Sequence, residues 1–357
     1  MKSTLSAVRA YVTNAGYGRE PRESPPGSPV EVSAFPKRGW TTTIWLGAPV
    51  PWILDAEGFA QAALRTFFTG ELGRAQNADP VALQRLTELR ESLGPTGKEG
   101  RWWVTIVCEQ QVDVPDDEWL DRPFIWVSPR VTDGMASEAR TKTSRAIDVL
   151  AGFVASTMPN AITGAPLFDR VFMRSGTRQP FPLLTPGAFP PSVHVSSSVP
   201  VDASGLGRAM RGLRPVLDRL ESSFYWWARS IEEPDDWRRF QFQYLALEIL
   251  VAKMEQVAKR AVLPTLRVGD GAAGVVPPQL LGERLTPAIS FALVALMLSP
   301  KTAADDSDTF ASLKSTRDRA SHGGVTIGET LPTAVAGALL ARYLSLAVRP
   351  EIPEAEE

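Results

Sequence analysis

The sequence predicts a mixed α+β protein, with an N-terminal α+β domain followed by a C-terminal domain made only of helices. Within residues 1–175, runs of aromatic and β-branched residues alternate with helical patterns. Residues 176–204 are rich in proline and serine, which indicates a linker because proline is not tolerated inside a helix. In residues 205–350 the apolar side chains keep a helical spacing. A chain of 357 residues is also long enough for two domains of ordinary size.

Aromatic and β-branched residues mark the expected strands of the N-terminal domain, and residues 102–108 (WWVTIVC) give the strongest strand signal. Strands are expected at residues 40–46, 102–108, 124–127 and 167–173. Helices are expected at residues 1–17, 55–68, 81–93 and 140–157. The proline-rich residues 18–38 are expected to form an extended connector. These local patterns do not predict the order of the strands in the sheet.

The C-terminal domain is expected to be a bundle of four to five helices. Its clearest helix is 235–262, where one apolar stripe from Trp237 to Ala261 continues for about seven turns. Helices are expected at residues 206–222, 235–262, 285–299, 308–322 and 329–347. A long loop is expected at residues 263–282, and a short surface strand is expected at 193–195 within the linker.

The charge and the counts of cysteine and histidine exclude several classes of site. With 38 basic and 40 acidic residues the net charge is −2, so any binding of nucleic acid requires a local basic patch. One cysteine, Cys108, excludes an intrachain disulfide framework, and two histidines, His194 and His322, exclude a histidine-rich metal centre. No metal and no cofactor are therefore expected. Cys108 is expected to be a buried small residue and His194 a surface residue.

The hydropathy pattern contains no run of the roughly 18 apolar residues that span a membrane. The first residues also lack the apolar core of a signal peptide. We therefore expect a soluble cytoplasmic protein that makes no membrane contact. One unpaired thiol fits a reducing compartment.

The segment 308–324 (DTFASLKSTRDRASHGG) carries the clearest chemical pattern in the chain. The two glycines that end it are a helix-stop signal, so His322 lies at or just past the last turn. Asp318 lies four residues earlier on the same face, where its carboxylate is expected to orient the imidazole or raise its pKa. Arg317 lies about 140° around the helix axis from His322, so the two side chains are expected to flank one edge.

The string RDRASH in this segment resembles the Arg-x(4–6)-His signature of the HEPN superfamily, in which Asp, Asn or His commonly follows the arginine. The F-x-x-L turn before the string and the glycines after it are similar to those of the ApeA-like HEPN domains. The earlier segment YLALEILVAKME, which contains Glu248, is similar to the first long helix of the family. The resemblance covers residues 205–347 and does not extend to residues 1–200.

This resemblance implies a metal-independent endoribonuclease that uses the 2′-hydroxyl of RNA as its nucleophile. The implied catalytic residues are Arg317, Asp318 and His322. The arginine would stabilise charge on the phosphate, the histidine would act as general acid or base, and the aspartate would orient one of them. The implied substrate-binding residues are Lys314, Arg319 and Ser321.

In this family two such motifs meet across a dimer interface to form one site. One motif histidine per chain therefore implies a homodimer with twofold symmetry. Proteins of this kind often act in bacterial toxin or antiphage systems. The N-terminal domain would then sense, restrain or target the nuclease, with a regulatory protein or a nucleotide as the trigger.

Three other interpretations remain open. The chain can be a catalytically inactive HEPN-like module that binds a nucleotide or a partner protein. It can be an enzyme whose site lies in the N-terminal half, although that half contains none of the common nucleotide-binding or hydrolase motifs. Residues 314–322 can also be only a solvated basic helix end, where the helix dipole favours cations.

Other polar and aromatic residues have simpler expected roles. Glu248 is expected to be an exposed helix carboxylate, with a polar residue that supports the site as the alternative. The aromatic run 224–227 is expected to belong to a core or interface cluster rather than to a base-stacking surface. Asp305, Asp306 and Asp308 are expected to provide negative charge at a helix N-terminus rather than a metal site.

Overall fold

A computed structural model gives the fold of most of the regular elements and identifies the chain as mixed α+β. It describes residues 2–14, 28–32, 39–47, 50, 101–113, 129–158, 161–162, 164–166, 168–175, 181–183, 213–264, 285–322 and 330–348. The chain divides into two compact units. One consists of Met1–Leu150 with Met158–Gly207, and the other of Ala151–Thr157 with Arg208–Glu357.

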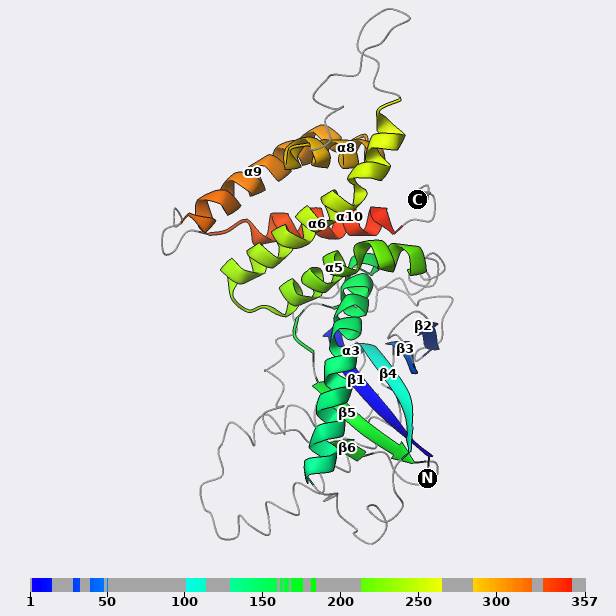
Figure 1. The fold of residues 1–357 in the computed structure, drawn as a ribbon. Helices are drawn as coiled ribbons and strands as arrows, with labels where there is room; N and C mark the ends of the chain where they lie inside the picture. Colours follow the sequence, from blue (N-terminus) through cyan, green and yellow to red (C-terminus); the bar gives the residue numbers. More distant parts are fainter. Residues whose placement is uncertain are drawn as a thin grey trace, which may run out of the picture. The chain divides into compact units, whose positions relative to one another are not determined.

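The first unit is built on an antiparallel sheet whose six described strands follow the order β2-β3-β4-β1-β5-β6 (Figure 1). The strands are β1 (Lys2–Asn14), β2 (Ser28–Val32), β3 (Trp40–Gly47), β4 (Arg101–Asp113), β5 (Phe168–Ser175) and β6 (Phe181–Leu183). The two longest strands, β1 and β4, pair along their whole length from Lys2 opposite Asp113 to Asn14 opposite Arg101. This pairing places the most apolar strand, β4, at the centre of the sheet, where its residues 104–108 are buried.

Helix α3 (Pro129–Thr157) contacts this sheet through polar side chains. Arg9 of β1 is only 5 % exposed, and its guanidinium forms an ion pair with Asp148 of the helix. The same guanidinium donates to Asp169 of β5, with the Nη2–Oδ2 distance at 2.7 Å. Because a buried charge without partners costs several kcal/mol, the two carboxylates are what permit an arginine at this position.

The second unit is a set of packed helices in which α6 contacts each of the other four described helices (Figure 1). They are α5 (Leu213–Glu232), α6 (Asp236–Val262), α8 (Pro287–Leu298), α9 (Ala303–Ser321) and α10 (Thr333–Ala347). Two helix starts are explained by their capping residues. The carboxylate of Asp235 accepts from the backbone N–H of Arg238 at 2.8 Å, and the hydroxyl of Thr286 accepts from that of Ile289.

Stacked aromatic rings form the centre of this helical unit. Phe291 and Phe310 lie almost parallel, with ring centroids 4.4 Å apart, and Tyr343 and Tyr244 pack beside them. All four side chains are buried. The rings come from α6, α8, α9 and α10, so this one cluster fixes four helices against each other.

The five helices expected in the C-terminal domain and four of the elements expected in the N-terminal half are confirmed. The strands at 40–46, 102–108 and 167–173 are present as β3, β4 and β5, and the helix at 235–262 is present as α6. The helices expected at 140–157, 206–222, 285–299, 308–322 and 329–347 are also present with shifted ends, as α3, α5, α8, α9 and α10. The apolar stripe of α6 is buried in its middle, but Trp237 and Ala261 at its ends are exposed.

One expectation about the N-terminal half is wrong, and two segments expected as connectors contain strands. Residues 1–17 do not form a helix, because Lys2–Asn14 is strand β1, whose Leu5 to Tyr11 are buried between two neighbouring strands. The connector expected at 18–38 contains strand β2, and the linker expected at 176–204 contains strand β6. β2 and β6 are the outermost described strands of the sheet. A proline such as Pro29 is tolerated in an edge strand, because its missing N–H can lie on the side that faces away from the neighbouring strand.

Several expected elements lie outside the described residues. They are the helices at 55–68 and 81–93, the strands at 124–127 and 193–195, and most of the loop at 263–282. His194 also lies outside them. Among the helices that are described, none is long and apolar enough to cross a membrane.

Candidate active site at the end of helix α9

Helix α9 presents its polar motif because its opposite face is held in the core. Phe310, Leu313 and Ala320 are buried and lie at intervals of three and seven residues, which places them on one face. The side chains of Arg317 and Asp318 are left half-buried at the edge of this face, and His322 follows the last turn with an exposed side chain. The expected helix at 308–322 therefore forms, and it begins five residues earlier, at Ala303.

The first turn of α9 is fixed by Asp306, which corrects the expectation of a purely electrostatic role. The Asp306 carboxylate is 6 % exposed and accepts hydrogen bonds from the hydroxyls of Thr302 at 2.7 Å and Tyr343 at 2.8 Å. It also forms an ion pair with Arg342. These three donors hold the pKa of Asp306 below its ordinary value, although burial acts in the opposite direction. Asp305 and Asp308 are exposed, as expected.

The guanidinium of Arg317 contacts three side chains. Its Nη2 donates to Glu248 Oε1 at 2.6 Å, and its Nη1 donates to Asp318 Oδ1 at 2.9 Å. Its central carbon lies 5.1 Å from the centre of the Tyr244 ring, a distance typical of a cation–π contact. Arg317 is therefore directed toward helix α6, which carries both Tyr244 and Glu248.

Asp318 is the link between the two cations of the motif. Its Oδ2 accepts from Lys314 Nζ at 2.5 Å, while its Oδ1 accepts from Arg317. The hydrogen bond from Lys314 is the main cause that holds the pKa of Asp318 below its ordinary value, and the charges of Lys314, Arg317 and His322 act in the same direction. Asp318 therefore stays ionised at neutral pH.

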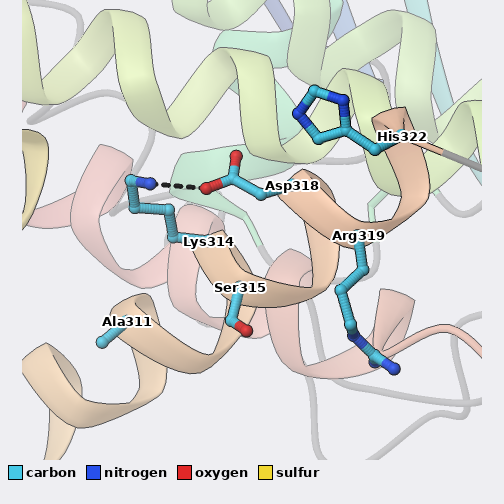
Figure 2. Close-up of a pocket in the computed structure, with 6 residues that line it drawn as sticks. All are labelled: Ala311, Lys314, Ser315, Asp318, Arg319 and His322. Carbon is cyan, nitrogen blue, oxygen red and sulfur yellow. Dashed lines mark hydrogen bonds and ion pairs between the residues drawn. The ribbon is translucent and has the colours of Figure 1, made fainter. Parts of the chain in front are cut away.

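His322 is the residue that ends the helix. Its backbone N–H donates to the carbonyl oxygens of Asp318 and Arg319, both at 3.2 Å. Its ring extends on the same side of α9 as the Asp318 carboxylate and Lys314 (Figure 2). Within the described residues the expected Asp318–His322 hydrogen bond is absent, because the carboxylate oxygens are bound by Lys314 and Arg317 instead.

A pocket of about 590 Å³ lies along this side of α9 (Figure 2). It is lined by Ala311, Lys314, Ser315, Asp318, Arg319 and His322. Four of the six expected site residues thus line one pocket. Arg317 adjoins it through Asp318, and Ser321 is exposed on the helix end without lining it.

Two residues of α6 contact the motif, although neither was among the site residues expected from the sequence. Glu248 is not an exposed carboxylate, because it is bound to Arg317 and its side chain is 27 % exposed. Tyr244 is 1 % exposed, and burial together with the nearby Glu248 charge raises the pKa of its hydroxyl. The two lie four residues apart, so they share one face of α6. That spacing is the one local signal that relates them.

Other polar groups of the described residues do not add a metal centre. No group of three His, Cys, Asp or Glu side chains among them is arranged to hold a metal ion. Cys108 is buried, as expected, and burial raises the pKa of its thiol to about 12. In the aromatic run 224–227, Phe224 is buried against Phe153, and Trp226 contacts Phe242, so these rings belong to a packed cluster.

Comparison of the chain with protein-family models, with curated proteins and with solved structures finds no match.

Proposed function

We propose that the chain is a metal-independent endoribonuclease of the HEPN type, whose helical part carries the site and whose N-terminal α+β part restrains or targets it. The observation that carries the proposal is the position of His322. It is exposed at the end of α9 and lines a pocket with Lys314, Asp318 and Arg319. An imidazole in this position is accessible to a substrate.

The cations around the pocket support binding of a phosphodiester. Lys314 and Arg319 line the pocket directly, and Arg317 adjoins it. A guanidinium has five N–H donors, and the two carboxylates bound to Arg317 engage one nitrogen each. N–H groups therefore remain for a phosphate oxygen. The planar fork of arginine suits the charge that develops on a pentacoordinate phosphorus.

The proposed reaction needs no nucleophile from the protein. His322 takes the proton from the 2′-hydroxyl of RNA, and the 2′-oxygen then attacks the adjacent phosphorus. The bond from phosphorus to the 5′-oxygen breaks, and a second imidazole gives its proton to that oxygen. The products are a 2′,3′-cyclic phosphate and a 5′-hydroxyl. Arg317 stabilises the negative charge of the transition state.

The proposed reaction needs a second imidazole, and a homodimer would supply it. Each chain supplies His322, so two chains related by a twofold axis would supply both the base and the acid. Sedimentation of the purified protein is then expected to give the mass of two chains. The proposal also includes a bacterial toxin or antiphage role, a cytoplasmic location, and triggering by a nucleotide or a regulatory protein.

A second candidate is a module that binds a nucleotide or a partner without cleaving RNA. The charge balance of the site favours it, because Lys314 and Arg317 are matched by Asp318 and Glu248. A site with little excess positive charge attracts a polyanion weakly. Cleavage assays separate the two candidates directly.

The test is cleavage of a single-stranded RNA by the full chain in the presence of EDTA, with the new ends identified by mass spectrometry. We expect 2′,3′-cyclic phosphate ends. His322→Ala is expected to lower the rate by about 10²–10⁴-fold, the contribution of a general acid or base. Arg317→Ala is expected to lower it by about 10²–10³-fold.

Arg238→Ala is the matched control, because Arg238 is an exposed arginine at the start of α6. It removes the same charge and is expected to leave the rate unchanged. Cleavage that continues in both site variants would contradict the assignment of the site. RNA that stays whole with the wild-type protein, together with tight binding of a nucleotide, would favour the second candidate.

A further inference from the structure

The side chains that hold Arg317 come from two helices far apart in the sequence. Glu248 lies on α6 and Arg317 on α9, 69 residues later, and their Oε1 and Nη2 atoms are 2.6 Å apart. We propose that Glu248 is a positioning residue, which fixes the Arg317 guanidinium and limits how strongly it binds a phosphate. This inference rests on the function proposed above, in which Arg317 stabilises the transition state.

The contact with Glu248 helps to fix the orientation of the Arg317 guanidinium. Asp318 binds the other Nη atom at 2.9 Å, so the two carboxylates together define the plane of the group. The Tyr244 ring, 5.1 Å from the central carbon, provides the third contact. This ring is itself rigid, because it is buried and stacks on Phe310 with centroids 5.9 Å apart. Arg317 is therefore held in one arrangement before any substrate arrives.

Such an arrangement has a benefit and a cost. An arginine already in place avoids the loss of side-chain freedom that binding would otherwise require. The Glu248 charge also competes with a phosphate for the same guanidinium, so it weakens ground-state binding. The Arg317 side chain is 30 % exposed, so it remains open to a ligand while both carboxylates stay bound. Removal of the Glu248 side chain and removal of only its charge are therefore expected to have different effects.

Two variants separate these effects in the full chain. Glu248→Ala removes the anchor, and kcat for RNA cleavage is expected to fall about 10–100-fold, as for a misplaced catalytic group. Glu248→Gln keeps an oxygen that can accept from Arg317, so kcat is expected to stay within about threefold of the wild type. The Gln variant is also expected to bind a 2′-deoxy-substituted RNA, which cannot be cleaved, about threefold more tightly because a nearby negative charge is lost.

Glu255→Ala is the matched control. Glu255 is a half-buried carboxylate on the same helix, about 10 Å further along it, and it binds Lys259 and Ser290 rather than Arg317. It is expected to alter thermal stability without changing kcat per folded molecule. Thermal unfolding of every variant gives the folded fraction, so a loss of folding is distinguished from a loss of positioning.

The outcomes of this experiment are distinct. An unchanged kcat in Glu248→Ala, when His322→Ala abolishes cleavage, overturns the role of Glu248 and leaves the proposed function in place. An equal fall of kcat in the Ala and Gln variants, with no tighter binding in the Gln variant, also overturns it. If the wild-type protein cleaves no RNA, the proposed function and this inference fail together.

Discussion

Replacement of Asp306 by alanine is expected to destabilise the helical unit by about 2–5 kcal/mol. The variant leaves the hydroxyl of Tyr343, which is fully buried, without the acceptor it has at 2.8 Å, and such a loss costs about 1–3 kcal/mol. The half-buried hydroxyl of Thr302 loses this acceptor too, but it keeps Ser299 as a partner, so the loss costs at most about 0.5–1.5 kcal/mol. Arg342 contributes less, about 0–1 kcal/mol, because its side chain is 41 % exposed and regains water.

The assay is urea unfolding at pH 7, followed by circular dichroism of the helices, with a double-mutant cycle. Tyr343→Phe removes the donor, so the double variant Asp306→Ala with Tyr343→Phe no longer leaves that hydroxyl unpaired. The coupling free energy between the two sites is expected to be about 1–3 kcal/mol. Asp306→Asn keeps a carbonyl oxygen for Tyr343 and is expected to cost roughly half as much as alanine.

Two results would refute this reasoning. One is an Asp306→Ala variant whose unfolding free energy lies within about 0.5 kcal/mol of the wild type, the usual range of a surface substitution. The other is strict additivity of the two substitutions, which would show that the hydrogen bond between them does not contribute. Either result would mean that the hydrogen bonds of Asp306 do not hold α9 in place.

The other predictions concern packing, acid stability and the thiol. Phe310→Ala removes a fully buried ring stacked on Phe291 and is expected to lower the unfolding free energy by about 3–5 kcal/mol in the same urea assay. Gly152→Ala is expected to lower the melting temperature, because its new methyl group would overlap the backbone carbonyl oxygen of Phe224. The pKa of Asp306 is lowered in the folded state, so its contribution to stability is complete above the unfolded pKa of about 3.9 and is lost as the pH falls through the folded value. Asp306→Asn is therefore expected to reduce the fall of the melting temperature with decreasing pH, measured between pH 6 and 2. Cys108, whose thiol pKa is raised to about 12, is expected to react with a thiol reagent at pH 8 only when the protein unfolds, and fast labelling of the native protein would contradict its burial.

The fold was predictable where local patterns and packing agree. Strands β3 and β4 consist of aromatic and β-branched residues that also become buried, so residues 40–46 and 102–108 were predicted correctly. Strand β1 was not, because Ser3, Ser6 and Arg9 interrupt its apolar residues and make the local pattern ambiguous. These polar residues are buried all the same, and Ser6 and Arg9 are satisfied by Glu109, Asp148 and Asp169. Those partners are more than 100 residues away in the sequence, so a local pattern does not contain them.

The same distinction applies to the candidate site. The spacing along one helix predicted that Asp318 and His322 lie on one face of α9, and both line the same pocket, together with Lys314. The spacing did not predict whether the Asp318 carboxylate would bind Lys314 or His322, since both are four residues away. In the structure, Asp318 binds Lys314. The Arg317–Glu248 contact depends on how α6 and α9 pack, which sequence spacing does not specify.

The end of α9 also constrains changes in the length of the motif. One backbone hydrogen bond ties the N–H of His322 to the carbonyl of Asp318, whose side chain binds both Lys314 and Arg317. A residue inserted between Arg317 and His322 would rotate the imidazole by about 100° and shift it by about 1.5 Å relative to the cations. A deletion would do the reverse. In this chain, either change is therefore expected to move the imidazole away from Lys314 and Asp318, with which it lines the pocket.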